Sequence, residues 1–132
     1  MSALPGFVLF LALTLLCLAG AVASGLRAKR KVHITCVAGA LACLGLTIYY
    51  ALGVGKHYDL ASAGWITPVH MWMAKIATAS YLLPIASGLR TIYRPATRRL
   101  HRKLAFGVLA LTVLTAITGT WMLLAAERLP ED

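Results

Sequence analysis

Four histidines and one lysine are the side chains of this sequence that could bind a cofactor inside or beside an apolar segment. They are His33, His57, His70, Lys75 and His101. Ionisable residues at such positions are rare and often functional. The apolar segments contain no Asp or Glu, and the chain has no Gly-rich phosphate loop, no HExxH motif and no CxxCH haem-attachment motif. Hydrolase, kinase and carboxylate proton-relay chemistry are therefore excluded.

His33 and His101 are the best candidate pair for a metal. Each follows a basic segment and lies near the start of an apolar run, so the two imidazoles are expected at the same depth. On diagonal helices of a bundle they would approach from opposite sides, as the two axial ligands of one haem do. The alternative is that each is one more polar residue of a basic interfacial loop. The sequence thus predicts a haem iron bound by His33 and His101.

His70, His57 and Lys75 are the candidates for the opposite side. His70 could bind a second haem together with His57 or Met122, although the equivalent position in the first half of the chain is near Phe7, which cannot bind metal. Lys75 could hold a quinone oxygen or a haem propionate, or it could be an interfacial anchor whose ammonium reaches water. The prediction is one haem b, with a second haem and a quinone left open.

Long apolar runs must position these side chains. The chain has 132 residues, of which 60% are hydrophobic and 13% charged, and its mean hydropathy is +0.79. Runs of about 20 apolar residues cross a membrane as helices, and none here alternates as a membrane strand would. We expect four helices, at residues 4–26, 32–53, 67–90 and 98–126, with a kink at Pro84. The predicted fold is a single all-α transmembrane domain over residues 1–132, an up-down four-helix bundle.

The basic residues predict the orientation. Of the 13 Lys and Arg residues, four lie in residues 27–31 and six in residues 90–103, whereas all three Trp are expected at the opposite edge. Positive loops stay in the cytoplasm. We therefore expect a multi-pass protein of the bacterial inner membrane with both termini extracytoplasmic. The charge of +9 marks topology, so no nucleic acid partner is expected.

A short repeat is visible along the chain. Ala23-Ser24-Gly25-Leu26-Arg27 recurs as Ala86-Ser87-Gly88-Leu89-Arg90, and each copy precedes a basic segment and then a histidine. Internal repeats are frequent in membrane folds. The pattern predicts a tandem duplication of a helical hairpin, although small residues and Arg are common at helix ends and could produce part of the match.

Several short motifs follow one another from residue 31 onward. They are Lys31-Val-His33, Val69-His70-Met-Trp-Met-Ala-Lys75, Leu83-Pro84, His101-Arg-Lys-Leu-Ala105 and Thr118-Gly119. This set resembles a family of bacterial four-helix membrane proteins that includes an assembly factor for haem–copper oxidases. The plan is more loosely similar to small b-type cytochromes of the cytochrome b561 kind. Unlike those, no helix here carries two histidines about a dozen residues apart.

Two functions are compatible with these observations. The first is a small membrane b-type haem protein that carries electrons between the quinone pool and a respiratory redox partner. The second is a cofactor-free assembly or scaffold subunit of a respiratory membrane complex. Both would be accessory or electron-transfer subunits rather than stand-alone enzymes. Both would contact the lipid bilayer and other membrane subunits of a respiratory complex.

Overall fold

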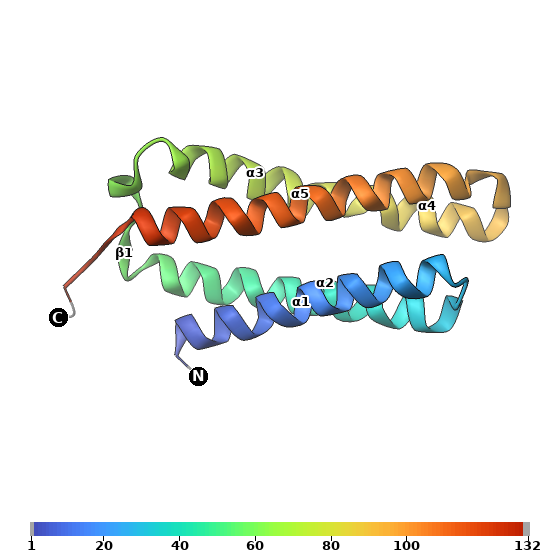
Figure 1. The fold of residues 1–132 in the computed structure, drawn as a ribbon, viewed down its shortest axis with the longest axis horizontal. Coiled ribbons are helices and arrows are strands. Elements are labelled where there is room, and N and C mark those ends of the chain that lie inside the picture. Colours follow the sequence, from blue (N-terminus) through green and yellow to red (C-terminus); the bar gives the residue numbers. More distant parts are fainter. Residues whose placement is uncertain (1, 131–132) are drawn as a thin grey trace. The chain divides into compact units, whose positions relative to one another are not determined.

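The chain is helical almost throughout, as the sequence predicts. A computed structural model describes residues 2–130, and within them the only other regular elements are two strands of two residues each (Figure 1). The chain divides into two compact units. The first comprises residues 1–58 and 128–132, and the second comprises residues 59–127.

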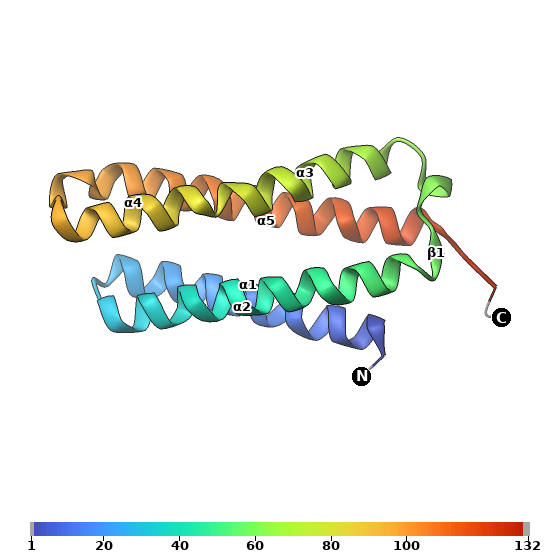
Figure 2. The same ribbon diagram turned by 180° about the vertical axis from the view of Figure 1, so that it is seen from behind.

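The first unit contains a hairpin of α1 (Ala3–Leu26) and α2 (Arg30–Gly55), which lie side by side in both views (Figures 1 and 2). Small residues let the two helices approach closely. A Cβ atom on Gly20 would lie 2.9 Å from the Cys36 sulfur, which is closer than ordinary van der Waals contact. Glycines at such crossings are typical of helix pairs in lipid.

A tight turn joins α1 to α2. The Lys29 N–H donates to the Ser24 carbonyl at 2.9 Å, and the Ala28 N–H donates to the Gly25 carbonyl at 3.2 Å. This is the Schellman pattern of a helix end, which requires a left-handed residue. Ala28 takes that conformation, with φ of 54°. The turn therefore reverses the chain within three residues.

The second unit contains a hairpin in which one arm is divided. Helices α3 (Ile66–Ser80) and α4 (Leu82–Tyr93) follow one another along α5 (Arg98–Ala125) (Figures 1 and 2). Short 3-10 turns precede α3 and α5, at Leu60–Ala63 (η1) and Pro95–Thr97 (η2).

Pro84 explains the break at Tyr81 between α3 and α4. Proline has no N–H to donate to the carbonyl four residues earlier, here that of Ser80, and its ring clashes with that carbonyl. The Tyr81 N–H donates to the Thr78 carbonyl at 3.4 Å, which is the tighter 3-10 pattern. The helix is thus interrupted three residues before the proline at which the sequence predicts a kink.

Each hairpin also has a buried side-chain hydrogen bond near its mid-length. In the first, the hydroxyl oxygens of Thr14 and Thr47 are 3.3 Å apart. In the second, the oxygens of Tyr81 and Thr112 are 2.9 Å apart. Because the Thr112 hydroxyl donates to the Val108 carbonyl at 2.8 Å, Tyr81 is the donor in that pair. These bonds satisfy polar groups that lipid cannot.

Three helical segments are long and apolar enough to cross a membrane: Ala3–Leu26, Arg30–Gly55 and Pro95–Ala125. These segments indicate a multi-pass membrane protein in contact with lipid. The fourth predicted span, residues 67–90, is divided between α3 and α4, which have 15 and 12 residues. Large apolar side chains remain exposed on the helices, including Leu16, Leu52 and Leu124 at 67%, 65% and 83%.

The two short strands are β1 (Tyr58–Asp59) and β2 (Glu127–Arg128), and they pair with each other. The boundary between the two units passes through both strands. Within the first unit, the Leu129 N–H donates to the His57 carbonyl at 3.0 Å. This bond holds the segment after α5 against the end of α2.

Candidate functional site

His33 lies in α2 and is half-buried against α1. Its Nδ1 atom is 2.8 Å from the Ala21 carbonyl oxygen. A carbonyl oxygen only accepts, so Nδ1 carries a proton and donates this hydrogen bond. The ring also lies over Gly25, where a Cβ atom would be 3.1 Å from Nδ1. A hydrogen-bonded Nδ1–H is the arrangement that orients histidine ligands of metals.

His101 lies near the start of α5. Its ring contacts α4 much as the His33 ring contacts α1. Its Nδ1 atom is 3.1 Å from the buried Ser87 hydroxyl oxygen. The same hydroxyl lies 3.3 Å from the Pro84 carbonyl oxygen, to which it can donate. The ring lies over Gly88, where a Cβ atom would be 3.1 Å from Cε1. The Nδ1 atom of His101 is therefore hydrogen-bonded within its own hairpin, as that of His33 is.

The contacts of the two hairpins repeat the sequence motif. In both, the glycine of the Ala-Ser-Gly-Leu-Arg segment receives the imidazole of the following helix. His33 belongs to the first unit and His101 to the second. The haem bound by both stays a prediction, and the structure adds the hydrogen-bond partner of each ring.

His70 makes a third contact of this kind, at the opposite end of the second hairpin. Its Nδ1 atom is 3.2 Å from the Thr118 hydroxyl oxygen, and that hydroxyl donates to the Leu114 carbonyl at 3.0 Å. A Cβ atom on the buried Gly119 would lie 2.7 Å from His70 Cε1. Positions 101 and 119 are separated by about 27 Å along α5 at 1.5 Å per residue. His70 and His101 therefore cannot bind one iron.

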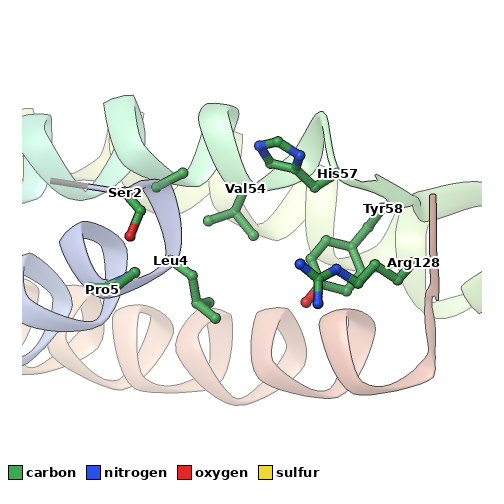
Figure 3. Close-up of a pocket in the computed structure, with 8 residues that line it drawn as sticks. Ser2, Leu4, Pro5, Val54, His57, Tyr58 and Arg128 are labelled. Carbon is green, nitrogen blue, oxygen red and sulfur yellow. The ribbon is translucent and has the colours of Figure 1, made fainter. Parts of the chain in front are cut away.

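His57 follows α2 and lines a cavity of about 370 Å³ on the first unit (Figure 3). The other lining residues come from the start of α1, from the end of α2 and the residue after His57, and from β2: Ser2, Ala3, Leu4, Pro5, Val54, Tyr58 and Arg128. His57 and His33 lie at opposite ends of α2. Neither hairpin alone thus supplies two histidines at one end.

Lys75 is exposed on α3, and its Nζ atom lies 5.2 Å from the centroid of the Trp72 ring. A cation over an indole face is attracted by the ring quadrupole. Trp72 is 65% exposed and precedes Lys75 by one helical turn. This contact and the exposure of Lys75 are compatible with the interfacial-anchor alternative. The predicted role of Lys75 toward a quinone or a propionate stays a prediction.

The small residues near the histidines pack within their own hairpins. Cys36 lies against Gly20, and Thr112 and Gly119 lie against Tyr81 and His70. These contacts are close packing of the two helices within each hairpin. Among residues 2–130, no group of three or more His, Cys, Asp or Glu side chains could hold a metal ion. A haem needs only two protein ligands, so this observation concerns other metal sites.

Several residues of these sites lie outside the sequence-based candidates. The Ala21 carbonyl, Ser87 and Thr118 are the hydrogen-bond partners of the three rings, and Arg128 lines the cavity. The Ser-Gly and Thr-Gly dipeptides are visible in the sequence, but their contacts depend on helix register. Nothing in the sequence marks Arg128, because a fold contact brings it beside α2.

Comparisons with protein-family models, curated protein sequences and solved structures found no match.

Proposed function

We propose that this chain is a small membrane haem b protein that carries electrons between the quinone pool and a respiratory redox partner. In this proposal the two hairpins pack as an up-down four-helix bundle, with His33 and His101 as the axial ligands of one haem. The observation that carries the proposal is the hydrogen bond that Nδ1 of each ring makes within its hairpin, with the Ala21 carbonyl and with the Ser87 hydroxyl.

The residues present fit a haem in their donor chemistry. In this proposal iron binds the lone pair of a neutral imidazole at Nε2 of each ring, while Nδ1 keeps its hydrogen bond within the hairpin. The second bond of each ring fixes its orientation and raises the basicity of the ligand nitrogen. Bound haem supplies one-electron redox chemistry, and the protein supplies ligands, burial and nearby charge. The exposed Arg102 and Lys103 beside His101 are suitable partners for propionates.

The proposed location is the bacterial inner membrane, with both basic segments in the cytoplasm and both termini outside. Exposed alanines offer a matched pair of labelling positions, Ala61 in η1 and Ala96 in η2. In a variant without the three native cysteines, Ala61→Cys should react with an impermeant reagent added outside. Ala96→Cys should react only after the membrane is opened. The reverse pattern would contradict the orientation.

A visible absorption spectrum tests the cofactor directly. We expect a reduced-minus-oxidised signal of low-spin haem b from the full chain purified with haem available during expression. The alternative is a cofactor-free assembly or scaffold subunit, which is also the role suggested by the resemblance to the oxidase assembly family. One observation favours it: the hydrogen bonds and glycine contacts of His33 and His101 also serve helix packing. A colourless protein that co-purifies with a respiratory complex would support that alternative.

A further inference from the structure

The cavity on the first unit combines polar donors with an apolar wall. Arg128, His57 and Tyr58 line it together with Leu4, Pro5 and Val54 (Figure 3). Its eight lining residues include the Arg128 guanidinium. We propose that this cavity binds the phosphate group of an anionic phospholipid. The proposal depends on the chain spanning a membrane and is independent of haem.

The polar side of the cavity suits a phosphate. A guanidinium binds phosphate oxygens through two parallel hydrogen bonds, and a tyrosine hydroxyl can donate a further one. The Leu129 N–H bond to the His57 carbonyl, 3.0 Å long, holds the segment that carries Arg128 beside Tyr58. Figure 3 shows the Arg128 and Tyr58 side chains directed to the same part of the cavity.

The first turn of α1 adds a second attraction for an anion. Ser2 is the N-cap residue, and its side chain makes no capping hydrogen bond. The first N–H groups of a helix have no partner within the helix, and the helix dipole is positive at this end. Ser2 and Ala3 both line the cavity, so this end of α1 faces the same space as Arg128.

The membrane position of the cavity favours a lipid as the source of the phosphate. Helix α1 has 24 residues, a length of about 36 Å at 1.5 Å per residue, which exceeds a hydrocarbon core of about 30 Å. The start of α1 therefore reaches the headgroup level. Leu4 and Pro5 are exposed, and the buried Val54 lies behind them, so glycerol and upper acyl carbons meet an apolar surface. An uncharged quinone ring would not use the positive charge.

Native mass spectrometry of the full chain, released from detergent micelles, can test the proposal. The probes are phosphatidylglycerol, phosphatidylcholine and inorganic phosphate. We expect one phosphatidylglycerol molecule to bind in preference to phosphatidylcholine, and inorganic phosphate in large excess not to displace it. Arg128→Gln should weaken that binding about tenfold, since it removes a charge-assisted contact. Arg27→Gln is the matched control, because Arg27 is exposed in the turn at the other end of α1 and also loses one charge.

A second variant blocks the space without changing the charge. Ser2→Trp alters an exposed position at the mouth of the cavity and should also weaken phosphatidylglycerol binding. Circular dichroism checks that each variant keeps its helices, and Tyr58→Phe replaces Arg128→Gln if that variant unfolds. If Arg27→Gln weakens lipid binding as much as Arg128→Gln does, the effect is one of net charge and the proposal is overturned. Displacement of the lipid by inorganic phosphate or by an uncharged quinol analogue overturns it as well.

Discussion

At the turn between its helices, each hairpin packs an imidazole from its second arm against a glycine of its first, His33 on Gly25 and His101 on Gly88. At the opposite end the two hairpins differ. In the first, the Tyr50 ring of α2 lies over Gly6 of α1. In the second, the His70 ring of α3 lies over a glycine of α5. Each hairpin thus has a ring–glycine contact at both of its ends. Both hairpins use a histidine for that contact only at the turn.

The difference concerns which side chains each hairpin supplies at its two ends. At its turn each hairpin has an imidazole whose Nδ1 is hydrogen-bonded within that hairpin. At the other end the first hairpin has the Tyr50 phenol on a glycine, and its remaining histidine, His57, follows α2. The single haem that we propose would use the residue type that both turns have in common. A second haem would need His70 and a ligand of another origin.

The largest expected effect comes from removing one histidine at a turn. His33→Ala or His101→Ala should each abolish most bound haem, because one axial ligand alone leaves an open iron in a shallow site. His57→Ala is the control and should keep the haem content, measured as the reduced-minus-oxidised signal per polypeptide. Full haem content in both turn variants, with an unchanged low-spin spectrum, would contradict the proposed ligation. If His70→Ala loses a separate fraction of the bound haem, the protein binds a second haem.

The next largest expected effect is a loss of stability when a glycine at the end opposite the turn is replaced by alanine. Gly6→Ala would place a Cβ atom 2.5 Å from two atoms of the Tyr50 ring, which also stacks on Phe10 with a centroid distance of 5.5 Å. Overpacking of this kind costs about 1–3 kcal/mol. Gly119→Ala should cost less, because the nearest atom, 2.7 Å away, is the distal Cε1 of His70.

Two other glycines provide controls for this comparison. A Cβ atom added to Gly45 in α2 or to Gly107 in α5 would have no neighbouring heavy atom within 4 Å, so alanine there should be neutral or slightly stabilising. Thermal unfolding in detergent, followed by circular dichroism, measures all four variants. Equal melting temperatures for Gly6→Ala and Gly45→Ala would show that the Tyr50 contact is not tight.

The partners of the two turn histidines predict a difference between the hairpins. Ser87→Ala removes a hydrogen-bond partner of His101 Nδ1, and loss of such an orienting partner typically costs about tenfold or more in metal affinity. Ser24→Ala, the equivalent change in the first hairpin, should leave haem affinity unchanged, because His33 bonds to the Ala21 carbonyl. Haem titration of the two variants measures this. The same loss in both would mean that the serines act through packing alone.

The smallest expected effect concerns Lys75 on α3. As an interfacial anchor over Trp72, its exposed ammonium contributes about 0.5–1 kcal/mol. Lys75→Met should then change stability little and leave quinol-linked haem reduction at the wild-type rate. A reduced rate with intact haem would instead support the role at a quinone or propionate that the sequence leaves open. Stopped-flow reduction with a quinol analogue distinguishes the two.

Sequence reasoning predicts the helices well, because the length of each apolar run and the position of Pro84 determine the backbone within a few residues. The division at Tyr81 and the turn through Ala28 follow from backbone chemistry within a few residues. The histidines themselves are also visible, because ionisable groups are rare in apolar runs. Their partners are not, since a ring reaches Ala21 or Ser87 only when two helices adopt one register. Arg128 is the extreme case, because it follows every helix and yet lines the cavity beside the start of α1.

The bond between Leu129 and His57 has a consequence for the order of biosynthesis. A ribosome makes residues 128 and 129 after all of the helices, so the first hairpin can enter the bilayer long before Arg128 exists. The cavity on that hairpin is therefore completed last. A chain truncated after α5 would keep its helices but have no guanidinium beside Tyr58, so the proposed capture of a phospholipid would depend on the residues that follow α5.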